Sequence, residues 1–429
     1  MITKKLGILT ASSLVISSMI GTGVFTSLGF QVVDIKSGFA ILFLWLIGGI
    51  VAFCGAVCYA ELGSVYKRSG GEYNLLRELY HPALGFVAGW VSITVGFAAP
   101  ASLAAIALAS YLSTIIPGLP ENHIAAVTIL LFGIIHAQSL QLGSRIQNVT
   151  TVLKVVLILI FILVGFGVSI PQEVILTPSS QSWTEIASPP FAVALIYVSY
   201  AYTGWNSSIY IIGEMKEPNR DLPKSLFLGT LIVMILYLML NYIFLYTVPI
   251  SKLAGELEVG FLSGQAIFGE LGGVIIAIAI SILLLSTVSA YVFLGPRVSK
   301  ELGEDMRAFR LLAKTNAKGI PINAYIFSTI LSLVFIYTST FEQVLLYTSF
   351  LLISITTITV TGIFVLRLKG KIQSDGYKAW GYPFTPVIFI LVSLWTLIFV
   401  AVQQPFESGV SVGIFLLGIV LYFVTKNKV

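Results

Sequence analysis

Long apolar runs, separated by short polar connections, follow one another along the whole chain. About 20 consecutive apolar residues suffice for a helix to cross a bilayer. The pattern therefore predicts an all-α polytopic membrane protein with twelve transmembrane helices. They lie at residues 6–30, 38–62, 83–113, 123–140, 145–168, 190–213, 223–248, 271–296, 322–339, 343–366, 384–403 and 409–425.

The centre of the first run departs from the apolar pattern. The stretch Ser17–Phe25 reads SSMIGTGVF, with serines, a threonine and two glycines where apolar residues are expected. Glycine weakens a helix, and hydroxyl groups compete for its backbone hydrogen bonds. We therefore predict a broken helix, whose free N–H and carbonyl groups suit a zwitterion. Close helix packing through small residues is the alternative interpretation.

The sixth run carries a matching interruption. Its centre, Ser199–Ser208, reads SYAYTGWNSS and is again small and polar. Because this run lies five spans after the first, residues 1–168 and 190–366 are expected to be inverted copies of five helices each. Interrupted helices at matching positions in two halves indicate a transporter's binding site. Residues 384–429 would then add two peripheral helices and a cytoplasmic C-terminus.

The placement of positive charge predicts the orientation in the membrane. If the N-terminus is cytoplasmic, every basic residue falls on the cytoplasmic side except Lys36, Lys252 and the intramembrane Lys154. The positive-inside rule thus supports twelve spans with both termini in the cytoplasm. Lys4 and Lys5 precede the first run without a small-residue cleavage pattern, so we expect that helix to be retained.

Composition narrows the function classes further. The chain is 57% hydrophobic and 10% charged, and no Asp or Glu falls near the middle of a predicted span. Cys54 and Cys58 share one apolar run, which predicts neither a disulfide framework nor a metal site. An intramembrane enzyme would need converging His, Asp, Glu or Cys side chains. We therefore expect no catalytic residues, no cofactor and no nucleic-acid partner.

Four motifs together resemble the amino acid–polyamine–organocation superfamily over nearly the whole chain. They are Gly21–Phe25 (GTGVF), Gly70–Tyr73 (GGEY), Tyr200–Asn206 (YAYTGWN) and Gly213–Pro223 (GEMKEPNRDLP). Within it, the chain is most similar to bacterial relatives of the L-type amino-acid transporters, the light subunits of heteromeric exchangers. Those subunits carry a cysteine between spans 3 and 4. The loop at 116–122 has none, so no disulfide-linked heavy subunit is expected.

This resemblance implies a substrate site at the two breaks. The substrate carboxylate would meet the N–H groups of the first break, and the α-ammonium would meet carbonyls of both breaks. Tyr200 would be the aromatic gate. Asn206 stands near a Glu of arginine-carrying relatives, which indicates neutral substrates. The implied binding residues are Met19, Gly21, Thr22, Gly23, Tyr200, Thr203, Asn206 and Tyr237.

Lys154 lies inside the fifth run, nine residues after Arg145 and roughly 13 Å along a helix that rises 1.5 Å per residue. An intramembrane ionisable residue is a functional hypothesis, and snorkelling to the interface is the alternative. The resemblance implies that its ammonium replaces the sodium ion that links spans 1 and 8 in sodium-coupled relatives. The implied partners are Ser17, Ile20, Ser286 and Thr287.

The sequence thus predicts a sodium-independent transporter of neutral L-amino acids in the bacterial cytoplasmic membrane, most simply an exchanger that works by alternating access. Thr203 stands where large-neutral carriers often have glycine. With Tyr200 and Tyr237 it should leave room for small substrates such as alanine, serine, glycine or cysteine. A proton-coupled symporter and an exchanger of large neutral amino acids remain the alternatives.

Overall fold

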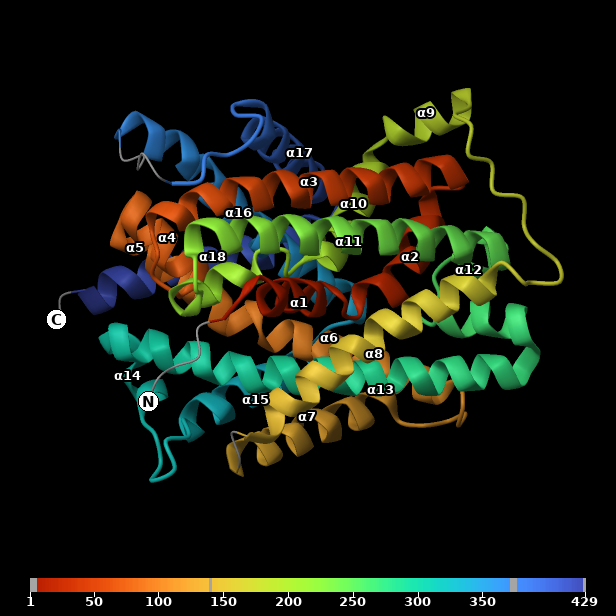
Figure 1. Cartoon of the computed structure of the whole chain (residues 1–429). Coiled ribbons are helices and arrows are strands. Elements are labelled where there is room, and N and C mark those ends of the chain that lie inside the picture. Colours follow the sequence, from red (N-terminus) through yellow and green to blue (C-terminus); the bar gives the residue numbers. More distant parts are fainter. Residues whose placement is uncertain (1–5, 139–140, 371–375, 427–429) are drawn as a thin grey trace.

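A computed structural model describes residues 6–138, 141–370 and 376–426, and these residues form a bundle of helices (Figure 1). Within them, eight helices are long and apolar enough to cross a membrane, or nine if the bent pair at Ser180–Ile186 and Pro189–Glu214 is one span. Each of the twelve predicted runs coincides with a helix or with a broken helix. The chain is therefore an all-α polytopic membrane protein, as predicted.

The helices lie roughly parallel to a common axis (Figure 1). They are α1 (Ile8–Met19), α2 (Gly23–Asp34), α3 (Gly38–Val65), α4 (Gly71–Leu79), α5 (Pro82–Val91), η1 (Ser92–Gly96), α6 (Ala98–Ser113), α7 (Glu121–Gln138), α8 (Gln141–Gly165), α9 (Ser180–Ile186), α10 (Pro189–Tyr202), η2 (Ser207–Glu214), α11 (Pro218–Thr247), α12 (Ile250–Leu253), α13 (Val259–Asp305), η3 (Arg307–Phe309), α14 (Arg310–Ala313), α15 (Ile322–Thr338), α16 (Phe341–Leu368), α17 (Phe384–Gln403) and α18 (Pro405–Lys426).

The two ends of the bundle differ in charge. The end of the bundle that carries α4, α5, α14 and the last turn of α18 is called the terminal face, and it lies at the left in Figure 1. Lys67, Arg77, Lys216, Arg310 and Lys369 are also at this end. On the opposite face, Lys36 and Lys252 are the basic residues of the described chain. Lys4 and Lys5 lie outside the described residues.

Large apolar side chains cover the outside of the bundle. Leu163 of α8, Ile330 of α15 and Val402 of α17 are each more than half exposed. Such a surface would be unfavourable in water, whereas lipid tails are as apolar as these side chains. The exposed apolar belt agrees with the spans that hydropathy predicts.

Three elements depart from the predicted boundaries. The third span contains a π-helical turn, η1, between α5 and α6. Helix α13 begins twelve residues before the predicted 271, and Gly269 (φ 74°) separates its first turns from its long segment. The short helix α4 lies in the predicted connection between the second and third spans. A π-helical turn often marks a functional site.

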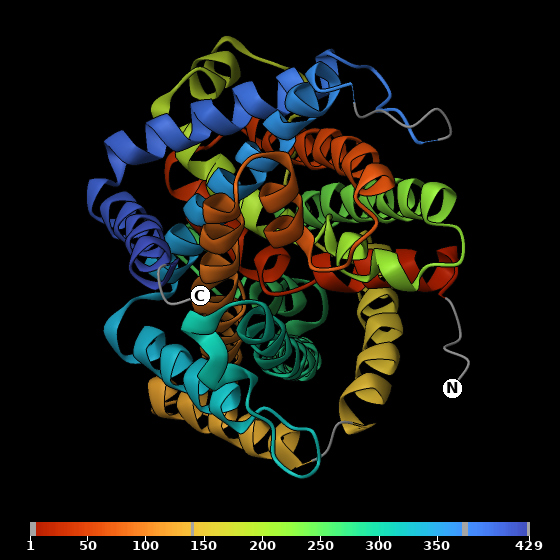
Figure 2. The ribbon, with the colours of Figure 1, turned by 90° about the vertical axis from the view of Figure 1, so that its left-hand side faces the viewer.

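Small residues bring α3 against the second broken span. A side chain at Gly48 would overlap Val198 of α10, and one at Gly49 would overlap Met234 of α11. Glycine therefore permits the close helix approach on which packing in membranes depends. Seen from the terminal face, α1 lies between α8 and α11 (Figure 2), and it contacts both.

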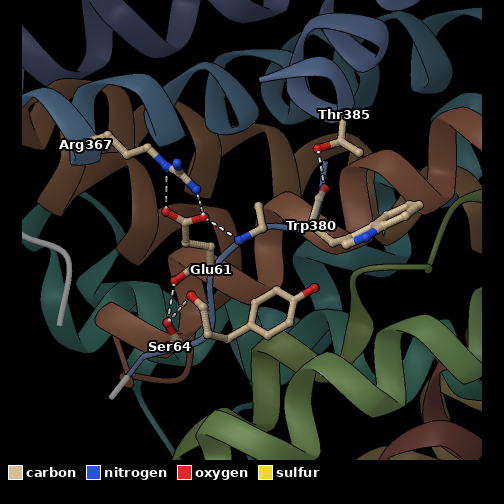
Figure 3. Close-up of polar contacts among 7 residues, drawn as sticks. Glu61, Ser64, Arg367, Trp380 and Thr385 are labelled. Atoms are coloured by element: carbon tan, nitrogen blue, oxygen red, sulfur yellow. Dashed lines mark hydrogen bonds and ion pairs between the residues drawn. The ribbon is translucent and has the colours of Figure 1, made fainter. Parts of the chain in front are cut away.

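A buried ion pair fixes the segment that leads into α17 (Figure 3). Glu61 of α3 accepts two hydrogen bonds from Arg367 of α16, at 3.0 and 2.8 Å. The same carboxylate accepts the N–H of Ala379 at 2.6 Å. The Arg367 guanidinium also lies 3.5 Å from the centre of the Tyr382 ring. Three separate parts of the chain are thus joined at one carboxylate.

Candidate functional site

The first span is broken where the sequence predicts. Helix α1 ends at Met19, Ile20 is extended (ψ 91°), and α2 begins at Gly23. The N–H groups of Gly21 and Thr22 donate to no other described residue. The first N–H groups of α2 have no acceptor within the helix either, as in any helix. The break therefore presents unpaired donors at the positive end of a helix dipole.

The second break lies directly against the first. Helix α10 ends at Tyr202, residues 203–206 form a turn, and the 3₁₀ helix η2 follows. Gly204 has a φ of 105°, and a Cβ there would lie 2.7 Å from the carbonyl carbon of Ser18. A Cβ on Gly23 would lie 2.5 Å from the Cα of Ala201. The two unwound stretches are therefore in backbone contact.

Tyr237 of α11 joins the two breaks. Its hydroxyl lies 2.7 Å from the carbonyl oxygen of Met19 and 3.2 Å from that of Ala201. The side chain is fully buried and does not line the cavity described below. The structure thus places Tyr237 behind the breaks, where it contacts their backbone.

Lys154 reaches the first break from α8. Its side chain is 3% exposed, and Nζ donates to the carbonyl oxygen of Ile20 at 2.9 Å and to Oγ1 of Thr287 at 3.0 Å. Thr287 lies on α13, so the ammonium bridges α1 and α13 across the interior. The side chain therefore points away from the membrane interface that a snorkelling lysine would seek.

The other two predicted partners of Lys154 are the Ser17 carbonyl and Ser286. The Ser17 hydroxyl donates to the carbonyl of Leu14 in its own helix, at 3.0 Å. Ser286 is buried next to Thr287 on α13. Ile20 and Thr287 thus accept hydrogen bonds from the ammonium in this conformation.

Tyr200 lies between the breaks and the opposite face. Its hydroxyl is 3.1 Å from Oγ1 of Thr22, and the ring is buried. Nearer the opposite face, Tyr111 of α6 donates to the carbonyl of Phe25 at 2.9 Å and accepts the N–H of Gly260 at 3.1 Å. These contacts join α2, α6, α10 and α13, and they close the breaks toward the opposite face.

A cavity of about 430 Å³ lies between the breaks and the terminal face. The predicted site residues that line it are Ser17, Ile20, Gly21, Lys154, Thr203, Asn206 and Thr287. The other predicted site residues are not among its lining residues, namely Met19, Thr22, Gly23, Tyr200, Tyr237 and Ser286. The π-helical turn contributes Ser92 and Gly96 to the same wall. The cavity therefore gathers residues from both breaks, from α8 and from α13.

A carboxylate that sequence reasoning did not assign to the site also lines this cavity. Glu72 of α4 is 5% exposed and accepts hydrogen bonds from Tyr59 at 3.0 Å, from Asn206 and from Tyr210. It belongs to the Gly70–Tyr73 motif. Gly71 has a φ of 59°, and a side chain there would overlap the Tyr210 ring. The motif thus turns the chain so that Glu72 enters the bundle, although it lies in a connection.

A second cavity, of about 280 Å³, adjoins the first near the terminal face. The two share Ser92, Tyr210 and Val298 as lining residues. The second cavity is also lined by Arg68 and Asp305, which form a partly exposed ion pair at 3.0 Å. These three side chains therefore lie at the boundary between the two cavities.

Two interrupted helices that meet beside a cavity inside a multi-span bundle are typical of a secondary transporter. The comparison with protein families agrees with this class. The family model of amino acid permeases matches residues 6–424, so the chain belongs to the amino acid permease family, within the superfamily that the motifs resemble. Transport of amino acids across a membrane is the activity that this family membership supports.

Curated relatives span nearly the whole chain. The serine/threonine exchanger SteT of Bacillus subtilis is 28% identical over 99% of this chain and 97% of its own. The mouse b(0,+)-type amino acid transporter 1 is 27% identical over 98% of this chain and 87% of its own. The human large neutral amino acids transporter small subunit 2 is 25% identical over 98% of this chain and 80% of its own. These relatives are transporters, in agreement with the expectation of a non-enzymatic protein.

Proposed function

We propose that this protein is a sodium-independent exchanger of small neutral L-amino acids. The observation that carries the proposal is the contact of the two breaks beside a buried ammonium. The N–H groups of Gly21 and Thr22 are unpaired among the described residues. The Lys154 ammonium donates a hydrogen bond to the carbonyl of Ile20. A zwitterion needs such donors for its carboxylate and nearby carbonyls for its ammonium.

The substrate would lie in the cavity against both breaks. Its carboxylate accepts from the amides of Gly21, Thr22 and Gly23, at the positive end of α2. Its α-ammonium donates to carbonyls near Met19, Tyr200 and Thr203. The Met19 carbonyl already accepts from Tyr237, but a carbonyl oxygen has two lone pairs and can take a second donor.

The position of Lys154 supports the proposal of sodium independence. A cation that links α1 to α13 is already supplied by the protein as a covalently attached ammonium. Because this charge cannot leave, no dissolved ion is needed to hold the two helices together. The serine/threonine exchanger among the relatives also favours exchange over net uptake.

Neutral and small substrates are favoured by the groups around the cavity. The carboxylate of Glu72 already accepts three hydrogen bonds from the protein, so it is engaged and poorly placed to pair with a cationic side chain. Thr203 fills part of the space beside the second break, and its hydroxyl turns back to the Ser199 carbonyl at 3.2 Å. The methyl group of Thr203 would therefore limit the size of the substrate side chain.

Alternating access would use the contacts on the two sides of the site. In this conformation the cavity adjoins the terminal face, and the Tyr200–Thr22 and Tyr111–Phe25 contacts close the opposite face. We assign the terminal face to the cytoplasm of a bacterial cell, since positive charge gathers there. Both termini are then cytoplasmic. No heavy subunit is expected, since the loop at 116–122 lacks cysteine.

Labelled alanine uptake into proteoliposomes tests this function. We expect rapid uptake when the vesicles contain unlabelled alanine, little uptake into empty vesicles, and equal rates with sodium or choline. Uptake into empty vesicles that a pH gradient drives would instead establish the proton symporter. In competition at equal concentration, alanine should inhibit more strongly than leucine or phenylalanine. The reverse order would refute the size argument and favour an exchanger of large neutral amino acids.

A further inference from the structure

The contact between Glu72 and Asn206 fixes the orientation of the Asn206 amide. The Asn206 side chain has a nitrogen that donates and an oxygen that accepts, and the two are easily interchanged by a flip. An ionised carboxylate accepts hydrogen bonds and donates none. The side-chain nitrogen of Asn206 therefore faces Glu72. Turning the amide over would bring its oxygen against the carboxylate oxygen, which is repulsive.

The remaining bonds of Glu72 reinforce this arrangement. Tyr59 donates to the same carboxylate oxygen as Asn206, and Tyr210 donates to the other. Tyr59 in turn packs edge-on against Trp205, with ring centroids 4.8 Å apart, directly beside Asn206. The carboxylate is 5% exposed, so water competes little for these bonds. Glu72 is thus held as a fixed acceptor behind Asn206.

The oxygen of the Asn206 side chain therefore faces the cavity. Among the described residues this oxygen has no hydrogen-bond partner. It is also not fully buried, unlike the unpaired polar atoms of the protein interior. Asn206 lines the same cavity as Gly21 and Thr203, which belong to the two breaks. An acceptor of fixed direction therefore stands in the cavity that would hold the substrate side chain.

We propose that Glu72 is a positioning residue which makes Asn206 a hydrogen-bond acceptor for the substrate side chain. The inference rests on the proposed function and narrows its substrate class to small amino acids with a donor, in particular a hydroxyl group. Serine should bind better than 2-aminobutyrate, which has the same shape with a methyl group for the hydroxyl. Because a neutral hydrogen bond contributes modestly in net terms, the expected preference is about 3- to 10-fold.

The test measures half-saturation concentrations for exchange of serine and of 2-aminobutyrate in proteoliposomes. Their ratio, taken on one preparation, does not depend on the amount of active protein. In the wild-type protein we expect serine to have the lower value by about 3- to 10-fold. Equal values, with both amino acids exchanged, would overturn this inference and leave the proposed exchange intact. Absence of any amino-acid exchange would instead refute the proposed function.

Two variants separate positioning from a general structural role. In the Glu72→Gln protein the side chain can donate as well as accept, so the Asn206 oxygen is no longer held toward the substrate and the preference for serine should fall. The Glu78→Gln protein is the matched control, since it makes the same change at an exposed carboxylate of α4. It should retain the wild-type ratio. A Glu72→Gln protein with an unchanged ratio, or with both values raised equally, would refute the positioning role. If that variant does not fold, the ratio of half-saturation concentrations in the wild-type protein still tests whether the substrate hydroxyl is recognised.

Discussion

Replacing Lys154 with alanine is expected to abolish most alanine exchange. The substitution removes the donor to the Ile20 carbonyl at the first break and to the Thr287 hydroxyl oxygen on α13. A hydrogen bond from a charged group contributes about 1.5–3 kcal/mol, which corresponds to a factor of roughly 10 to 150. We therefore expect the initial rate of counterflow, normalised to inserted protein, to fall at least tenfold.

Two controls distinguish loss of charge from loss of volume. The Lys154→Met protein restores most of the side-chain volume without a donor, and we expect it to be as impaired as Lys154→Ala. The Val155→Ala protein changes the neighbouring position on α8 and should keep near wild-type exchange. Wild-type rates in the Lys154→Ala protein would refute the role of the ammonium. Recovery in the Lys154→Met protein would show that packing, not charge, is what the site requires.

Breaking the Glu61–Arg367 pair is expected to cause the largest loss of stability. In the Arg367→Met protein the Glu61 carboxylate stays buried and keeps only the Ala379 N–H among the partners described above (Figure 3). Removal of one partner from a buried pair costs about 3–5 kcal/mol. We expect the lower end of that range, because the Arg367 side chain is 22% exposed. The midpoint of thermal unfolding in detergent measures the change.

The Arg68–Asp305 pair provides a matched control on the same face. It has one hydrogen bond, at 3.0 Å, and the Arg68 side chain is 62% exposed. Exposed pairs contribute about 0–1 kcal/mol, so the Arg68→Met protein should unfold close to the wild-type midpoint. The double variant Glu61→Met with Arg367→Met should recover much of the loss, since no unpaired charge remains. Equal midpoint shifts for Arg367→Met and Arg68→Met would contradict this account.

The sequence predicts the breaks because their cause is local. Two glycines and three hydroxyl residues in the middle of an apolar run cannot support a regular helix, and α1 ends within that stretch at Met19. The same holds for the turn after Tyr202 in the sixth span. Lys154 could be singled out for an equally local reason, since a charge so deep in a span is costly.

Tertiary contacts explain what the sequence pattern does not reveal. Glu72 lies in a connection, and hydropathy carries no information about whether a connection folds into the bundle. The positive φ values of Gly70 and Gly71 make that insertion possible, so the paired glycines were a usable signal. The role of Tyr237 at the substrate stays a prediction, and its hydroxyl contacts the backbone carbonyls of Met19 and Ala201, which the sequence does not reveal. Periodicity places a residue on a helix face without saying which neighbour meets it.

The division into two inverted repeats remains a prediction, as do the roles of the individual site residues. The contacts described here give each role a physical basis. The amides of Gly21 and Thr22 are unpaired among the described residues, Lys154 holds Ile20, and Glu72 orients Asn206. The central claim is that the first break binds the substrate carboxylate directly.

A structure of the protein with bound alanine tests that claim most directly. We predict the alanine carboxylate within about 2.7–3.2 Å of the backbone nitrogens of Gly21, Thr22 and Gly23. In the same structure, Lys154 should still donate to the Ile20 carbonyl. A carboxylate bound to the Lys154 ammonium, or alanine bound away from both breaks, would contradict the account.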